Sequence, residues 1–395
     1  MTAISRRSVV ATGLGAALAG CADTSISVAR PASTSSASAT SALGEGALKP
    51  LDLSVGNLTR MTVCTRPFRP AGPRLETETI AGKTVIHNYG HGGSGWSLAW
   101  GYADEVRIRL AAFQPKSVSV LGAGAMGLTT AIALAETGAK VTIIARDLPM
   151  ESRSAYATGV WSPSSRIGLK SAVEEAFPAL WASLARKSYA RHLQYVGRAG
   201  HPVEFTPRFY LRTKAPEPML SPEPESGNDF LHLDRMIRDL TPPWAEIETH
   251  PFPNEAGVRS GMVMTFNIAE YTRQLTDDFL AMGGRIERGE IASLEDLAQL
   301  PGDVAVNCSG FDAKVLAGDS TLIPVRGQIS WMPAQTDRLY GIIHRNVTAL
   351  SRRDGVIIQE TGGTDYYGLG DDSVAASREE FLSAQAKVAP MFDWQ

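Results

Sequence analysis

The chain has 395 residues, of which 44 % are hydrophobic and 20 % are charged, and its net charge is −3. This composition is ordinary for a soluble globular protein with one large domain or two intermingled ones. The slight acidity argues against a nucleic-acid-binding protein, which would be basic. No apolar run reaches the roughly 18 residues that a membrane-spanning helix needs.

Residues 1–21 have the pattern of an export signal. Arg6 and Arg7 precede a short apolar run that ends in LAGC at Cys21. A positive region followed by a short apolar region is typical of signal peptides. The paired arginines resemble a Tat signal, and LAGC resembles a bacterial lipobox, in which the cysteine is lipidated. We expect an exported bacterial protein, periplasmic or anchored to the membrane through Cys21. A plain signal peptide with a chance cysteine is the alternative.

Residues 22–48 are rich in serine, alanine and threonine, so we expect a flexible linker before a single large domain at 49–395. The first motif of that domain is TRPFRPAGPRLE at 65–76, which carries Arg66, Arg69 and Arg74. The last two arginines would fit a solvated basic strand equally well.

The next run, HNYGHGGSGWSLAWG at 87–101, contains five glycines and two histidines. Glycines without side chains allow the backbone to approach a ligand closely. We expect a helix to begin between Ser94 and Ser97 and to continue through Phe113. For His87 and His91, structural hydrogen bonding is the favoured role.

A second glycine run follows the apolar strand-like segment SVSVL at 117–121. It places Gly122, Gly124 and Gly127 at GxGxxG spacing before a helix-like segment and a second strand, VTIIAR. Strand, glycine turn, helix and strand form the βαβ unit that binds a dinucleotide pyrophosphate at a helix N-terminus. Asp147 is the candidate ribose ligand, but Arg146 could indicate the 2′-phosphate of NADP. This unit alone therefore leaves the cofactor open.

The cysteines indicate neither a metal site nor a disulfide framework. Cys21, Cys64 and Cys308 show no CxxC pattern and no zinc-like spacing with histidine. Cys64 and Cys308 could pair in an oxidising compartment. Because Cys308 follows an apolar strand-like run, a buried free thiol is the favoured state.

Several motifs together resemble the FAD-dependent D-amino-acid oxidase family. They are TRPFRPAGPRLE (65–76), VIHNYGHGGSGWSLAWG (85–101), ARDLPMESRSAYATGVWSP (145–163), VNCSG (306–310) and PVRGQ (324–328). The resemblance implies an α/β fold in which an FAD-binding, Rossmann-like GxGxxG domain is interleaved with a β-rich substrate domain. The flavin-binding parts would be 82–165 and 286–316, and the substrate parts 60–81, 166–285 and 317–395.

The order of these motifs departs from the family. The arginine segment and HNYGHGG close the chain in the family, whereas here they precede GxGxxG. This order indicates a circular permutation whose joint is FQPKS at 113–117. Close domain termini and exposed loops tolerate such rearrangements. The two glycine runs should then flank one cavity, and 51–61 should lie close to 388–395.

The resemblance also implies the roles of particular residues. Arg66 would clamp the substrate carboxylate in a bidentate pair, and Gly93 would lie at the edge shared by substrate and flavin. The helix after Gly93 would favour the negative charge of the reduced flavin. The expected cofactor contacts are Gly122, Ala123, Gly124, Met126, Gly127, Asp147, Ser154, Gly159, Val160, Gly92, Gly93, Ser94, Gly95, Trp96 and Ser97.

The implied reaction is the oxidative deamination of D-amino acids. Hydride passes from the substrate Cα to FAD, electrons pass to O₂, and the imino acid is hydrolysed to a 2-oxo acid and ammonia. However, Thr348 stands near the position of a carboxylate-binding tyrosine of the family. Two alternatives therefore remain: an oxidase or dehydrogenase of amines or N-substituted glycines that uses another electron acceptor, and a non-catalytic lipoprotein with a flavin fold.

Overall fold

The computed structural model describes residues 48–214, 218–221, 223–253, 257–335 and 338–394. The expected export signal, Cys21 and all of the expected linker except its last residue lie outside this range. Within the described part, no helix is both long enough and apolar enough to cross a membrane.

The described residues form a mixture of strands and helices. The strands are β1 (Arg60–Phe68), β2 (Thr77–Ile80), β3 (Lys83–His87), β4 (Ser117–Leu121), β5 (Lys140–Ala145), β6 (Val203–Arg212), β7 (Ala245–Ile247), β8 (Gly257–Phe266), β9 (Arg285–Arg288), β10 (Val304–Asn307), β11 (Ile323–Met332), β12 (Gly341–His344), β13 (Val347–Arg352) and β14 (Gly355–Glu360). The α-helices are α1 (Gly95–Ala111), α2 (Ala125–Ala135), α3 (Phe177–Leu193), α4 (Ile268–Ala281), α5 (Leu294–Gln299), α6 (Ala313–Leu316) and α7 (Arg378–Val388).

A six-stranded sheet contains the βαβ unit predicted around GxGxxG. Its order is β2-β3-β10-β4-β5-β9, and the strands from β3 to β9 run parallel. Parallel sheets need cover on both faces, which explains why β10 is completely buried and β4 is buried from Val118 onward. The sheet begins at β2, before the boundary at residue 82 expected from the sequence, because β2 forms an antiparallel hairpin with β3.

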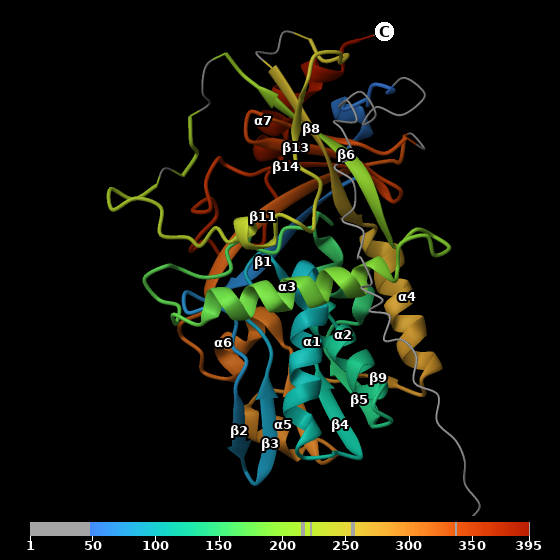
Figure 1. Ribbon diagram of the computed structural model, residues 1–395, viewed down its shortest axis with the longest axis vertical. Helices are drawn as coiled ribbons and strands as arrows, with labels where there is room; N and C mark the ends of the chain where they lie inside the picture. Colours follow the sequence, from blue (N-terminus) through green and yellow to red (C-terminus); the bar gives the residue numbers. More distant parts are fainter. Residues whose placement is uncertain (1–47, 215–217, 222, 254–256, 336–337, 395) are drawn as a thin grey trace, which may run out of the picture. The chain divides into compact units, whose positions relative to one another are not determined.

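An eight-stranded, mostly antiparallel sheet forms the second layer (Figure 1). Its order is β1-β11-β14-β13-β12-β6-β8-β7. Edge strand β1, which carries the arginine motif, pairs with β11 so that Arg66 lies opposite Val325. The N-terminal part of the domain thus supplies strands to both sheets, because β3 is an inner strand of the other sheet.

The helices bury a large apolar core against the six-stranded sheet. Helix α1 packs on both α2 and α3, and α4 packs on α2. Trp181 of α3 is fully buried in this core. Helix α4 therefore covers α2, the helix of the GxGxxG unit, although residues 166–285 were expected to belong to the substrate part.

The two ends of the described domain lie against each other. Leu51 and Leu53 share one buried cluster with Val388 and Phe392, and the Gln385 side chain donates a hydrogen bond to the Leu53 carbonyl at 3.0 Å. The structure thus brings the start of the segment 51–61 against residues 388–392, a proximity that a permuted chain would require.

Candidate functional site

A cavity of about 570 Å³ lies at the carboxyl ends of the parallel strands. The segments that follow β3, β10, β4, β5 and β9 all contribute to its lining: residues 89–93, 308–312, 122–126, 146–147 and 289–292. Ligands of open α/β sheets bind in this crevice, and the volume lies within the range of small-molecule and cofactor sites. The two glycine runs line the same cavity.

The GxGxxG turn has the backbone geometry of a pyrophosphate loop. Gly122 has a φ of +99°, and a Cβ there would lie 2.5 Å from the Cys308 carbonyl oxygen. The next residues turn into α2, so that the helix N-terminus faces the cavity from Ala125. Anions are stabilised at such a terminus by free N–H groups and by the helix dipole. Gly127 does not line the cavity; it packs against the Gly122 carbonyl and keeps the turn tight.

The HNYGHGG run forms the opposite wall. Gly92 has a φ of +54°, and a Cβ there would collide with the carbonyl oxygen of Arg166. Helix α1 begins at Gly95, within the range that the sequence predicts, and Gly92, Gly93, Gly95, Trp96 and Ser97 line the cavity. Ser94 is buried outside the lining, where its hydroxyl donates to the His91 carbonyl at 2.7 Å.

Both histidines of this run are buried, and both have a lowered pKa. Burial lowers the pKa of His91 to about 3, and the ring packs edge-on against Tyr102 with centroids 4.3 Å apart. Burial and the charge of Arg74 also lower the pKa of His87, whose ring contacts Glu78 at 3.2 Å. His91 lines the cavity, whereas His87 does not.

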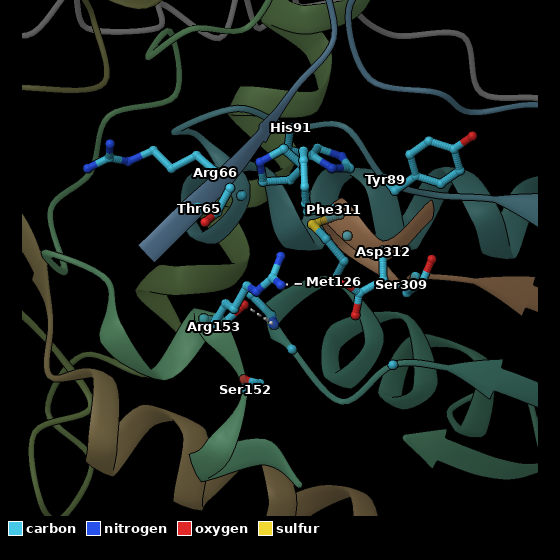
Figure 2. A pocket seen from close by; sticks show the side chains of 18 of the residues that line it. Thr65, Arg66, Tyr89, His91, Met126, Ser152, Arg153, Ser309, Phe311 and Asp312 are labelled. Carbon is cyan, nitrogen blue, oxygen red and sulfur yellow. Dashed lines mark hydrogen bonds and ion pairs between the residues drawn. The ribbon is translucent and has the colours of Figure 1, made fainter. Parts of the chain in front are cut away.

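A charged cluster occupies the end of the cavity near β5. Arg146 pairs with both Asp147 and Asp312 at 2.9 Å, and Arg153 approaches Asp312 at 3.4 Å. Figure 2 shows Arg153 and Asp312 facing each other, with the Arg66 side chain leading away from this pair. Both the expected ribose ligand, Asp147, and the rival Arg146 line the cavity, and they neutralise each other. Arg153 and Asp312 were not among the site residues predicted from the sequence, because only the fold brings them together.

The segment 154–160 closes the cavity between its two glycine walls. The Ser154 hydroxyl accepts a hydrogen bond from the Ala125 N–H at 3.1 Å, and the Ser154 carbonyl accepts one from the Trp96 indole at 2.9 Å. Gly159 and Val160 line the cavity, and Val160 forms a β-bridge with Thr265. Ser154, which was expected to contact the flavin, lines the cavity and also joins the α2 turn to the start of α1.

A second cavity of about 780 Å³ adjoins the first, with which it shares Arg66, Gly93, Thr158, Val160 and Ser162. Arg66 thus lines both spaces, and its guanidinium donates to the Arg326 carbonyl at 3.3 Å. Arg69 and Arg74, by contrast, are engaged with carboxylates: Arg69 contacts Asp319 at 3.2 Å, and Arg74 contacts Glu76 at 2.7 Å.

Thr348 lines this second cavity from β13. Tyr340 does not line it; its hydroxyl donates to the Lys49 carbonyl at 2.6 Å within another buried cluster. Tyr367, after β14, does line it and donates to Glu380 at 3.3 Å. Arg166 and Arg208 also line it. These three residues were not predicted, because they lie outside the motifs.

Cys64 and Cys308 are both free thiols. The sequence favoured this state over a disulfide between them. Burial raises the pKa of Cys308 to about 12, so this thiol stays protonated and inert at neutral pH. Cys64 lines the first cavity, and its thiol contacts the Arg153 carbonyl at 3.6 Å.

The first cavity fits a dinucleotide in chemistry and in layout. It combines an anion-binding helix terminus, a charged end beside β5 and a side-chain-free wall at Gly92 and Gly93. A Cβ on Gly95, at the start of α1, would enter open space. FAD bound here would have its pyrophosphate at Gly122–Met126 and its ring near Gly93 and Val160, next to the second cavity.

Comparisons with known proteins agree with this assignment. The family model described as "FAD dependent oxidoreductase" (DAO) matches residues 117–393. A D-amino-acid oxidase of Rubrobacter xylanophilus is 32 % identical over 216 residues, covering 53 % of this chain and 57 % of the relative. One of Dictyostelium discoideum is 24 % identical over 277 residues, covering 69 % and 73 %. The chain thus spans little more than half the length of the Rubrobacter relative.

A solved structure, glycine oxidase from Geobacillus kaustophilus, is 15 % identical with a TM-score of 0.49, covering 70 % of this chain and 78 % of that one. The expected cofactor, FAD, and the expected fold, a Rossmann-like layer combined with a β-rich layer, are confirmed by the family match and the two sheets. The chain belongs to the DAO family of FAD-dependent oxidoreductases.

Proposed function

We propose that this chain oxidises the Cα–N bond of D-amino acids to an imino acid, which water then hydrolyses to a 2-oxo acid and ammonia. The observation that carries the proposal is the position of Arg66 in the lining shared by both cavities. When bound, FAD supplies the acceptor for the hydride that leaves the substrate Cα. O₂ or another acceptor would take up the two electrons and complete the turnover.

The protein's own contribution is positioning. Arg66 would hold the substrate carboxylate as a charge-assisted pair, so that the Cα lies beside Gly93 and Val160. Effective positioning of this kind can supply much of the rate without a side-chain nucleophile. Helix α1, beginning at Gly95, would stabilise negative charge near its N-terminus.

The proposal is tested by replacing Arg66 with alanine. Arg66→Ala should raise the KM for a D-amino acid by about 10- to 100-fold, because a hydrogen bond to a charged group is worth about 1.5–3 kcal/mol, with the FAD content unchanged. Arg60→Ala is a matched control on the same strand, where Arg60 stacks on Trp331 at 4.4 Å. Normal turnover of a carboxylate substrate by Arg66→Ala would remove Arg66 from this role.

An N-substituted glycine or another amine is the second candidate substrate. It is favoured by Thr348, which leaves more room in the second cavity than a tyrosine would. A substrate panel that monitors anaerobic flavin reduction separates these candidates from each other and from a non-catalytic protein, whose flavin would not be reduced. Peroxide release against dye reduction then identifies the electron acceptor.

We further propose that the chain is a circular permutant of its family. The family model matches 117–393, yet β1 and β3 precede this range and pair with β11 and β10 inside it. A reordered chain, 117–394 followed by a short linker and 48–113, should fold and bind FAD like the original. The control carries the same linker between 113 and 117 without reordering. If only the reordered chain fails to bind FAD, the permutation is refuted.

We also propose that the protein is exported and tethered through Cys21, a residue outside the described range. Arg6, Arg7 and the LAGC ending at Cys21 support this proposal. In cells fed labelled palmitate, the wild type should carry label in the membrane fraction. Cys21→Ser should be unlabelled and released into the soluble fraction, and a labelled Cys21→Ser protein would exclude this cysteine.

A further inference from the structure

The second cavity is lined by an excess of cationic side chains. Its arginines are Arg66, Arg166, Arg208, Arg235 and Arg238, and its carboxylates are Asp234 and Glu360. The Glu360 carboxylate is itself engaged by Lys387, which lies 2.7 Å from Glu360 Oε2. A cavity whose lining carries an excess of one sign of charge concentrates ligands of the opposite sign.

Arg166 lies beside Arg66 but lacks a tight carboxylate partner. It donates to three backbone carbonyls, those of Asp365 at 2.7 Å, Thr364 at 3.4 Å and Tyr367 at 3.4 Å. The Asp365 carboxylate lies 3.8 Å from Arg166 Nη1, beyond hydrogen-bonding distance. Burial, with the charge of Arg66, lowers the pKa of Arg166 to about 10. The guanidinium therefore remains charged at neutral pH and only partly compensated.

Arg208, on β6, is a buried cation without a carboxylate partner among the described residues. It is 2 % exposed, its Nη2 donates to the Thr265 hydroxyl at 3.2 Å, and its Nη1 has no partner in the described part of the chain. Burial and the charge of nearby Arg352 lower its pKa to about 9. Thr265 pairs with Val160, so Arg208 lies close to the residues that join the two cavities.

The same sheet contains an arginine with a purely structural role, and it differs from Arg208. Arg352 is also fully buried, but its guanidinium contacts the Asp354 carboxylate at 2.6 Å and donates to the carbonyls of Ala157 and Thr158 at 3.0 Å. A buried charge without such compensation is costly. In Arg208 that compensation is incomplete, and a ligand anion would supply it.

We propose that the second cavity takes a substrate with a second anionic group besides the carboxylate held by Arg66, and that Arg166 and Arg208 recognise this group. The inference rests on the proposed function, in which Arg66 holds the α-carboxylate. It assigns the substrate class: amino acids with an acidic side chain, such as dicarboxylic D-amino acids. The side-chain carboxylate would compensate the guanidinium groups that the protein's own carboxylates leave partly compensated.

The first test uses the wild-type holoenzyme and pairs of nearly isosteric substrates. The kcat/KM for D-glutamate should exceed that for D-glutamine by at least about tenfold, because hydrogen bonds to charged groups discriminate by this amount. D-aspartate and D-asparagine form a second such pair. Comparing D-aspartate, D-glutamate and D-2-aminoadipate then defines the preferred length of the substrate side chain. Equal turnover of every acid and its amide would overturn the inference, while that same turnover would uphold the proposed oxidase activity.

The second test is independent of turnover. Calorimetry should show glutarate binding to the holoenzyme at least about tenfold more tightly than butyrate, with the difference reduced by added salt. This readout separates the two proposals. If no D-amino acid reduces the flavin, the proposed function fails, whereas the preference for glutarate still decides whether the cavity recognises a second anionic group.

Variants assign the preference to the two arginines. Arg166→Gln and Arg208→Gln should each reduce the D-glutamate to D-glutamine ratio by about tenfold, and Arg166→Lys should retain most of it. Arg259→Gln is the control: Arg259 is an exposed residue of the neighbouring strand β8, and it pairs with Glu246 at 3.7 Å. FAD content and unfolding temperature report whether each variant folds. An unchanged ratio in both folded glutamine variants would contradict the assignment.

Discussion

Two buried histidines predict a steep acid limit for the stability of this protein. His192 of α3 is fully buried, with Nδ1 2.8 Å from the Tyr271 hydroxyl and Nε2 3.1 Å from the Trp96 carbonyl. The carbonyl can only accept, so Nε2 carries the proton and Nδ1 accepts from Tyr271. Burial lowers the pKa of both His192 and His91 to about 3. Both rings are therefore neutral in the folded protein across the physiological range.

The magnitude follows from the difference between the folded and unfolded pKa values. In the unfolded chain a histidine titrates near 6.5, so the unfolded state takes up a proton between pH 6.5 and pH 3 that the folded state refuses. Stability contributed by each ring is complete above pH 6.5 and is lost as the pH falls towards 3. Between pH 7 and pH 5 each histidine should cost about 2 kcal/mol of unfolding free energy, hence about 4 kcal/mol for the pair.

The assay is urea unfolding at pH 7 and at pH 5 with saturating FAD. His192→Gln keeps a donor and an acceptor but does not titrate, so its loss between the two pH values should be about 2 kcal/mol smaller than that of the wild type. His232→Gln, at an exposed residue, serves as the control. The reasoning is refuted if His192→Gln and the wild type lose the same unfolding free energy between pH 7 and pH 5.

Three further predictions concern Gly92 in the glycine run, the buried Arg352 and the two free cysteines. Gly92→Ala should lose FAD and at least about 1–2 kcal/mol of unfolding free energy, since a left-handed φ and a collision with the Arg166 carbonyl oppose any side chain there; full flavin content would contradict this. Arg352→Met should lower the unfolding free energy by about 3–5 kcal/mol in urea titrations, because Asp354 and two carbonyls lose their donor. Dithiothreitol should leave the unfolding midpoint of the wild type unchanged, because Cys64 and Cys308 are free; a shift would show a disulfide.

The parts of the site that sequence analysis could predict are those encoded locally. Strand β4, the turn at Gly122 and helix α2 occupy 19 consecutive residues, from Ser117 to Ala135. The spacing of their glycines directly indicates a tight backbone turn. The start of α1 at Gly95 was predictable for the same reason, since a glycine run gives way to helix-forming residues. The family motifs added the placement of Arg66, which spacing alone would not have supplied.

The remaining site residues depend on pairings between distant segments. Arg208 faces the second cavity only because β6 pairs with β12, which in turn pairs with β13. Arg166 and Tyr367 lie outside the motifs, and nothing in their local sequence indicates a site. Asp147 shows the opposite case: its spacing was informative, yet the adjacent Arg146 and the distant Asp312 determine its electrostatic surroundings.

The position of β1 and β3 ahead of the rest of the domain has a consequence for synthesis. The Trp331 indole, on β11, donates to the Thr62 hydroxyl 269 residues earlier in the chain, and Asn307 contacts His87 across 220 residues. Both strands leave the ribosome long before their partners exist. Since pairings of such sequence separation are slow and leave strand edges exposed, neither sheet can close until most of the chain has been made. We therefore expect the nascent chain to depend most on chaperones while only its N-terminal half has been made.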